Sequence, residues 1–452
     1  MAYFKKISLL LLFSIIALSG CSSDDSGGNL SLVITDFQPS YNQVVVKWEL
    51  VRPSAIIIQD LQIYRKDKNP DDTDTFLQPV LLANLPSNAT TYTDLNVPYK
   101  SEVSYFVRIR YKKVNDDTNG IDYTLESDVR TFSRNLVLFN QVPLQVQQDI
   151  LDANAFHILD KSGMGALKKY SASLKEITTS KTFTEGSLLN NRFHIYNNEV
   201  YVADTHGKIA RISATDYHLN ATYNTTISDN LNAFAVDGDR IYYQDENILN
   251  YYTISSGVST VGHLVSQMDY AETLSTNRFL FMYAQQGSYG FNIKGYSTLN
   301  CNSPDCFADY TIYPTGPATV PVYRTDPYIF AWNPAKDKFI TSYEGWVINL
   351  STLQPELKLN AITGKHYFQF AYDTGGNIYA TVQGEKTIHK FNSNYQLIDS
   401  ISTKLYPIFP MVTTSGLQVI GSYEAIDYWG FWYGYEFNFN EKNVLLRFFS
   451  KH

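Results

Sequence analysis

Hydrophobic and polar residues alternate with a period of two in several short runs between residues 30 and 134. From Val44 to Leu50, apolar side chains occupy positions 44, 46, 48 and 50, so they share one face of an extended strand. Similar runs extend from Ile56 to Tyr64 and from Tyr105 to Tyr111, and clusters of Pro, Asn and Asp separate them. Short strands at this spacing predict a β-sandwich over residues 30–134.

A longer pattern repeats between residues 142 and 450: one strand, a tight polar turn and a second strand. The first apolar residues of its seven copies are Phe156, Val200, Ile241, Phe279, Phe339, Ile378 and Leu417, at intervals of 44, 41, 38, 60, 39 and 39 residues. Such a period in a chain of strands predicts a β-propeller with four-stranded blades over residues 135–452. Seven blades are expected. Six and eight are alternatives, because the first and last copies are the least regular.

Propeller geometry indicates where binding residues should gather. The first strand of each blade lines a central channel, and the turns between second and third strands emerge on one face. Binding residues concentrate on loops that a rigid scaffold positions. The candidate ligand-binding residues in these turns are Asp204, His206, Tyr343, Trp346, Tyr428, Trp429, Phe431 and Trp432.

The aromatic candidates are concentrated in the last turn, which contains Tyr428, Trp429, Phe431 and Trp432. Rigid aromatic rings stack on sugar rings or anchor a protein partner. Tyr343 and Trp346 form a smaller version of this cluster in the fifth copy. The alternative is that these rings pack against a neighbouring blade or against the first domain.

The carboxylates in the same turns suggest a second chemistry. Asp204 lies two residues before His206, and other turns also carry Asp or Glu. Two carboxylates at a suitable separation hydrolyse glycosidic bonds, and oxygen ligands bind cations, but acidic residues also simply suit turns. No nucleophile-elbow, zinc-protease, phosphate-loop or dinucleotide motif occurs, so catalytic residues stay unassigned and no metal or cofactor is predicted.

Composition narrows the class of protein further. Aromatic residues make up 15% of the chain, with 35 Tyr, whereas charged residues make up 18%. Tyr fits a half-buried pleated surface, and such compositions are typical of β-rich proteins outside the cytoplasm. The net charge of −8 argues against a nucleic-acid partner, which requires a basic surface.

Residues 1–20 have the features of an export signal. Lys5 and Lys6 precede an apolar run of 12 residues that ends at Leu18, and a membrane span needs roughly 20. The following residues up to Cys21 read Leu-Ser-Gly-Cys and resemble the bacterial lipobox. This resemblance implies that the signal peptide is removed and that acyl chains on Cys21 anchor the protein to a membrane. The alternative is an ordinary signal peptide beside a chance cysteine.

The segment 21–29 reads as a flexible polar tether, with Asp24 and Asp25 among Ser and Gly. It resembles the acidic tether that Bacteroidota lipoproteins use to reach the outer face of the outer membrane. We therefore expect the protein at the cell surface, attached to the outer membrane through its N-terminal lipid. A plain linker is the alternative.

Two further cysteines, Cys301 and Cys306, are separated by four residues. In an oxidising compartment this spacing predicts a local disulfide, which contributes roughly 2 kcal/mol on the loop-entropy model. A structural zinc site is the alternative, but it requires two more ligands.

The predicted domains resemble two known families. The segments Val46-Lys47-Trp48, Thr91-Tyr92-Thr93-Asp94 and Ser104 to Arg110 resemble a fibronectin type III domain, which implies that Trp48 and Tyr105 pack in its core. The hairpin copies are similar to NHL and quinoprotein-like propeller repeats, and Val202-Ala203-Asp204 is the part that most resembles them.

These observations predict an all-β, lipid-anchored surface protein whose propeller binds a glycan or a protein partner. An extracellular carbohydrate-active enzyme, either a hydrolase or a lyase, is the first alternative. A structural subunit of an envelope complex is the second. The lack of a recognisable catalytic motif favours binding over catalysis.

Overall fold

The structure is a computed structural model that divides into two compact units, Met1–Arg134 and Asn135–His452. It describes residues 29–68, 78–114, 122–134, 136, 138–139, 142–160, 165–183, 193–203, 207–225, 233–245, 248–264, 268–276, 278–286, 292–300, 307–312, 330–352, 354–423, 425 and 446–450. Among these residues no helix is long and apolar enough to cross a membrane, and α1 (Leu359–Thr363) is a single short turn.

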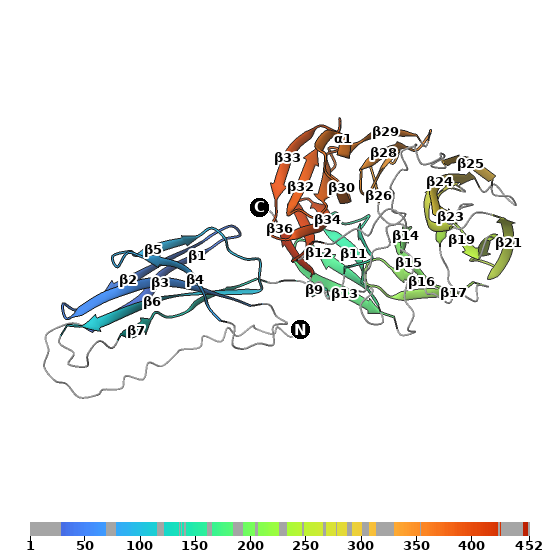
Figure 1. Cartoon of the computed structure of the whole chain (residues 1–452). Coiled ribbons are helices and arrows are strands. Elements are labelled where there is room, and N and C mark those ends of the chain that lie inside the picture. The colour runs from blue at the N-terminus through green and yellow to red at the C-terminus, as the bar shows by residue number, and fades with distance from the viewer. Residues whose placement is uncertain are drawn as a thin grey trace, which may run out of the picture. The chain divides into compact units, whose positions relative to one another are not determined.

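The first unit contains two antiparallel sheets (Figure 1). One has the order β1-β2-β5, with strands Ser31–Pro39, Val44–Val51 and Thr91–Asp94. The other has the order β4-β3-β6-β7, and its strands are Val80–Leu85, Ile56–Lys68, Glu102–Lys113 and Tyr123–Glu126. A further strand, β8 (Arg130–Ser133), also pairs with β6.

Alternation builds the core of this unit as the sequence predicts. Val44, Val46 and Trp48 are buried on β2 while the residues between them are more exposed, so one face of the strand is apolar. Tyr105 from β6 is fully buried, and its hydroxyl donates to Asp94 Oδ2 at 2.8 Å. Full burial of a large apolar side chain contributes about 1.5–3 kcal/mol, so Trp48 and Tyr105 act as core residues.

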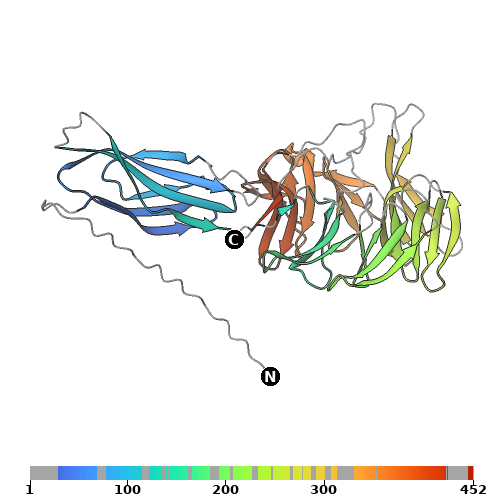
Figure 2. The same ribbon diagram turned by 90° about the horizontal axis from the view of Figure 1, so that it is seen from below.

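The second unit is a β-propeller, because its described strands form seven antiparallel four-stranded sheets around a centre (Figures 1 and 2). The first three sheets are β10 (Gln145–Gln148), β11 (Ala155–Asp160), β12 (Ala166–Ser171) and β13 (Glu176–Thr182); β14 (His194–Tyr196), β15 (Glu199–Ala203), β16 (Lys208–Ser213) and β17 (Leu219–Asn224); and β18 (Phe234–Asp237), β19 (Arg240–Asp245), β20 (Ile248–Thr253) and β21 (Val258–Leu264).

The remaining four sheets follow in chain order. They are β22 (Met268–Ser275), β23 (Arg278–Gln286), β24 (Asn292–Asn300) and β25 (Phe307–Ile312); β26 (Phe330–Trp332), β27 (Lys338–Thr341), β28 (Trp346–Asn349) and β29 (Pro355–Lys358); β30 (Tyr367–Tyr372), β31 (Ile378–Val382), β32 (Thr387–Phe391) and β33 (Leu397–Ser402); and β34 (Tyr406–Thr413), β35 (Gly416–Ser422), β36 (Leu446–Ser450) and β9 (Leu138–Phe139).

The first six predicted hairpin copies correspond to the second and third strands of these sheets, and the seventh copy begins on the second strand β35. Each residue that opens a copy, from Phe156 to Leu417, lies on a second strand. All seven are buried, since none is more than 8% exposed. The repeated pattern therefore marks the hairpin that carries most of each blade's core.

A strand from the start of the unit completes its last sheet. Strand β9 pairs with β36, so a segment near residue 138 forms the outer edge of a sheet built from residues beyond 405. Phe139 is 1% exposed and packs in one cluster with Phe156, Tyr170 and Ile420. Leu138 and Phe139 therefore belong to the last sheet of the propeller rather than to the link between the two units.

Candidate functional site

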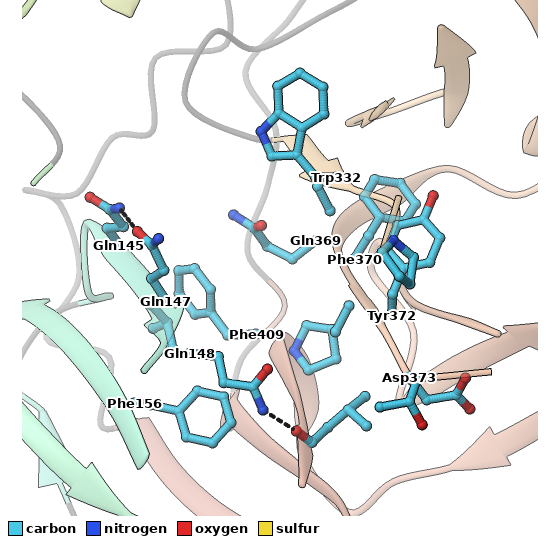
Figure 3. Close-up of a pocket in the computed structure, with 17 residues that line it drawn as sticks. Gln145, Gln147, Gln148, Phe156, Trp332, Gln369, Phe370, Tyr372, Asp373 and Phe409 are labelled. Atoms are coloured by element: carbon cyan, nitrogen blue, oxygen red, sulfur yellow. Dashed lines mark hydrogen bonds between the residues drawn. The ribbon is translucent and has the colours of Figure 1, made fainter. Parts of the chain in front are cut away.

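One pocket among the described residues lies in the propeller channel. It has a volume of about 420 Å³ and is lined by the first strands β10, β26, β30 and β34 (Figure 3). Pro334, Asp373 and Thr374 also line it, and they directly follow β26 and β30. The pocket therefore reaches the end of the channel where the first strands finish.

This end of the channel is opposite the face expected from the sequence. Consecutive strands in each blade are antiparallel, so the turns after the first strands and the turns after the second strands leave at opposite ends. The pocket includes residues of the first kind of turn. Binding by the opposite face stays a prediction.

Aromatic residues form the apolar part of the pocket wall. Phe156, Phe370 and Phe409 line it and are each less than 8% exposed. Trp332 is half-buried at the end of β26, and its ring meets that of Phe339 edge-on at 5.3 Å between centroids. This contact holds the indole in place and leaves part of its surface accessible.

A chain of amides forms one polar wall. Gln145 accepts from the backbone N–H of Phe193 at 2.9 Å and donates to the Phe193 carbonyl at 3.1 Å. The Nε2 atom of Gln145 also donates to Gln147 Oε1 at 3.0 Å. Because both ends of the Gln145 amide are fixed by one backbone unit, the orientation of Gln147 is fixed in turn.

Two more glutamines complete the polar lining. Gln148 Nε2 donates to the carbonyls of Ala153 at 2.7 Å and Val412 at 2.9 Å, so it links the first sheet to the seventh. Gln369 is only 9% exposed, and Figure 3 shows its amide extending from β30 toward the centre of the lining residues. The pocket thus combines carboxamides with aromatic rings.

The lining residues include one carboxyl group, that of Asp373. Its Oδ1 accepts from the backbone N–H groups of Gly375 at 3.0 Å and Asn377 at 2.9 Å, and its Oδ2 accepts from Asn377 Nδ2 at 2.7 Å. Burial alone would raise the pKa of Asp373, but these hydrogen bonds lower it below its usual range. The carboxylate is therefore anionic and is engaged by its own turn.

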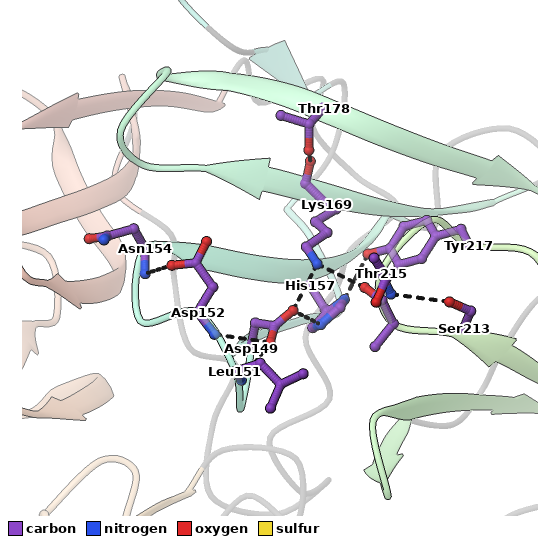
Figure 4. Close-up of polar contacts among 11 residues, drawn as sticks. Asp149, Leu151, Asp152, Asn154, His157, Lys169, Thr178, Ser213, Thr215 and Tyr217 are labelled. Carbon is purple, nitrogen blue, oxygen red and sulfur yellow. Dashed lines mark hydrogen bonds and ion pairs between the residues drawn. The ribbon is translucent and has the colours of Figure 1, made fainter.

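A second polar cluster, between the first and second sheets, resembles a catalytic relay but is sealed from solvent (Figure 4). His157 Nδ1 lies 2.8 Å from the Tyr217 hydroxyl, and its Nε2 lies 3.1 Å from Asp149 Oδ2. Lys169 Nζ approaches the same carboxylate oxygen at 2.9 Å. Burial lowers the pKa of His157 to about 4, and its side chain has no exposed surface. This cluster therefore links the first sheet to the second.

Two of the candidate residues taken from the turns, Tyr343 and Trp346, lie among the described residues, and both are half-buried and held by neighbours. The Tyr343 ring stacks on His366 at 4.0 Å between centroids. Trp346 Nε1 donates to Glu344 Oε2 at 2.9 Å, and Lys358 lies over the indole at 5.2 Å from its centroid. Neither residue lines the channel pocket.

The other candidate positions lie outside the described residues. They are the lipidation site Cys21, the cysteines Cys301 and Cys306, the pair Asp204 and His206, and the aromatic group Tyr428, Trp429, Phe431 and Trp432. Each stays a prediction. Within the described part of the chain, no group of three or more His, Cys, Asp or Glu residues is placed to hold a metal ion.

Sequence reasoning missed the pocket glutamines. Gln145, Gln147 and Gln148 immediately precede the first hairpin copy, where a first strand is required. The signal that would have identified these glutamines is a strand with three amides in four positions, at a place where the strand must face the channel. Gln369 occupies the equivalent first strand of the sixth sheet.

Comparisons with known proteins give structural likenesses at low identity. No protein-family model and no curated protein matches the chain. The crystal structure of the WD40 repeats of RRP9 matches with a TM-score of 0.46 and 9% identity, over 70% of this chain and 97% of that one. The structure of U3-55K matches with a TM-score of 0.45 and 9% identity, over 69% and 98%. At these scores neither likeness bears on what this chain binds.

Proposed function

We propose that this chain is a carbohydrate-binding protein and that its channel pocket holds the sugar. A sugar ring presents hydroxyl groups at its edge and C–H groups on its faces. The pocket offers matching chemistry, because the amides of Gln147, Gln148 and Gln369 share its lining with Trp332 and three phenylalanines. Small-ligand sites typically combine apolar surface with a few oriented polar groups, and here polar and apolar groups share the lining about equally. This combination is the observation that carries the proposal.

Binding is favoured over hydrolysis by the same lining. Glycoside hydrolases use two carboxyl groups about 5–9.5 Å apart, one of which must change its protonation state or attack the sugar. The lining residues include a single carboxylate, that of Asp373, and its turn already engages it. The lining residues therefore offer groups for recognising a sugar but not the two carboxyl groups that hydrolysis requires.

The architecture around the pocket is part of the proposal. Seven four-stranded sheets of described residues support a seven-bladed propeller. In the first unit, a three-stranded sheet β1-β2-β5 faces a second sheet across a core that contains Trp48 and Tyr105, which supports a fibronectin type III domain. Such a domain acts as a spacer or a binding surface, and its fold alone implies no chemistry.

We further propose that the protein works outside the cell, anchored to the outer membrane through lipid on Cys21. The support is the pattern of residues 1–29, in which a short apolar run ends at a lipobox-like cysteine followed by an acidic tether. In that oxidising setting, Cys301 and Cys306 form a local disulfide. A lipid-anchored binding protein would hold a glycan at the cell surface.

The experiment uses a pair of tryptophans from one blade. Wild type, Trp332→Ala and Trp346→Ala, each starting at residue 22, are tested on a glycan array, and hits are measured by calorimetry. Loss of Trp332 should weaken binding by about tenfold or more, equivalent to about 1.4 kcal/mol, because Trp332 is one of the lining residues. Trp346 lies outside it, so Trp346→Ala should bind as wild type does.

Circular dichroism verifies that both variants are folded. If Trp346→Ala loses binding and Trp332→Ala keeps it, the binding site lies on the face predicted from the sequence. If wild type binds no glycan on the array, carbohydrate binding is wrong, and the structural-subunit alternative becomes the better explanation.

A further inference from the structure

We infer that the pocket selects a neutral sugar unit, with Gln147 donating to it, Gln148 accepting from it and Gln369 doing both. This inference rests on the proposed carbohydrate function and adds the class of sugar. It follows from three features of the pocket: the fixed orientation of two amides, one buried amide that has no protein partner, and the charge of the lining.

Gln147 is oriented as a donor. Its Oε1 accepts from Gln145 Nε2 at 3.0 Å, and the Gln145 amide cannot rotate because it bonds both the N–H and the carbonyl of Phe193. The oxygen of Gln147 therefore stays toward Gln145, and its NH₂ group points the other way. In Figure 3 that nitrogen lies on the side facing Gln369. A sugar hydroxyl or ring oxygen is a suitable acceptor for it.

Gln148 is oriented as an acceptor. Both hydrogens of its Nε2 are directed to carbonyls, those of Ala153 and Val412, at 2.7 and 2.9 Å. Its oxygen is left to accept, and Figure 3 shows this oxygen on the pocket side of the side chain. A carboxamide oxygen accepts from a hydroxyl, but it cannot donate to a carboxylate.

Gln369 supplies the independent sign that a ligand belongs here. The residue is more than nine-tenths buried, yet its side-chain amide has no hydrogen-bond partner among the described residues. The amide atoms are not among the fully buried unpaired ones, so they meet solvent inside the pocket. A ligand that displaces this solvent without replacing its hydrogen bonds would lose about 1–3 kcal/mol, so a suitable ligand both donates and accepts. A hydroxyl group meets both needs.

The charge of the lining excludes acidic sugars. Asp373 is anionic, and the lining residues include no Lys, Arg or His. A uronate entering the pocket would lose hydration without gaining a cation, and it would be repelled by Asp373. The volume of about 420 Å³ is toward the lower end of the range of about 300–1,000 Å³ for small-ligand sites, which suits a chain end or a short oligosaccharide.

The test compares neutral and acidic oligosaccharides that differ only in whether C6 of each sugar unit carries a hydroxyl or a carboxylate. Tetrasaccharides of glucose, galactose and mannose are paired with those of glucuronate, galacturonate and mannuronate. Affinities are measured by calorimetry for the chain that begins at residue 22. At least one neutral probe should bind, and its uronate partner should bind about tenfold or more weakly.

Gln147→Glu is the decisive variant. A glutamate at this position still accepts from Gln145, so the wall is kept, but the donor to the sugar becomes a negative charge. We expect the neutral probe to bind about tenfold or more weakly to this variant. Gln396→Glu is the matched control, because Gln396 Oε1 likewise accepts from an amide, that of Asn392, in an exposed turn of the sixth sheet.

The outcomes separate the two proposals. If uronates bind as well as or better than neutral probes, or if Gln147→Glu keeps wild-type affinity, the neutral-sugar inference is wrong while carbohydrate binding stands. If no probe of either kind binds and the glycan array is also empty, both are wrong. A loss of binding in Gln396→Glu equal to that in Gln147→Glu would indicate a general charge effect and would also overturn the inference.

Discussion

At the scale of single residues, His157 shows how burial sets the chemistry of a group. Its ring is enclosed by Asp149, Lys169 and Tyr217, with no exposed side-chain surface. Burial lowers the pKa of His157 to about 4, because the cost of desolvating a charged imidazole exceeds the attraction of Asp149. The positive charge of Lys169 lowers this pKa further. At neutral pH the ring is uncharged and serves as a bridge between blades.

The propeller should therefore lose stability as the pH falls. An unfolded histidine binds its proton near pH 6.5, whereas folded His157 resists it until about pH 4. The contribution of neutral His157 to the free energy of unfolding is fully present above pH 6.5. It falls by up to about 3 kcal/mol as the pH drops toward 4. Urea unfolding at about pH 7.5 and pH 4.5 measures the change. His157→Gln should reduce the difference between the two values, and an unchanged difference would contradict the assignment.

At the scale of elements, the outermost strand of the seventh sheet is the shortest in the propeller and still fills a core position. Strand β9 has two residues, yet Phe139 is buried against the first and seventh sheets, and Lys168 Nζ lies 5.0 Å from its ring centroid. Two residue pairs with β36 contribute little stability by themselves. The buried side chain of Phe139 therefore supplies most of the energy that holds β9 in the sheet.

Phe139→Ala should cost about 3–5 kcal/mol of propeller stability, the usual loss for a fully buried phenylalanine. The free energy of unfolding in urea, taken from the propeller transition, measures it. Leu174→Ala is the control, because Leu174 is 61% exposed in a turn of the first sheet and its removal should change stability little. A loss below about 1 kcal/mol for Phe139→Ala would mean that β9 does not close the ring.

The hairpins were predictable from the sequence, but the inner strands and the pocket were not. Second and third strands, such as β11 and β12, follow each other across a tight turn, so alternation and turn residues mark them together. The inner strands β14 and β26 have three residues each, which is too short for a period to be read. The pocket gathers residues from 145 to 412, and only the closed ring brings them together.

At the scale of the whole molecule, closure depends on contacts between the two ends of the second unit. The hydroxyl of Tyr170 donates to Gln418 Oε1 at 2.8 Å, and Gln418 Nε2 donates to the Ala172 carbonyl at 2.9 Å. Gln148 makes a parallel link to Val412, so the pocket wall belongs to the same seam between first and seventh sheets. The proposed sugar binding would therefore share this interface with ring closure.

Closure of the ring by β9 leads to a prediction about truncated chains. A chain that starts at residue 135 keeps β9 and should unfold cooperatively, because its propeller core is complete. A chain that starts at residue 142 lacks β9 and the Phe139 side chain. Its melting temperature in calorimetry should be lower by more than roughly 5–8 °C, because that shift corresponds to the loss of about 3–5 kcal/mol with the buried ring alone and the strand pairing is lost as well. The longer chain carrying Phe139→Ala should melt between the two, since it keeps the strand pairing but loses the buried ring. Equal melting temperatures for all three chains would show that the ring closes through Gln418 and Tyr170 alone, with β9 as a dispensable edge.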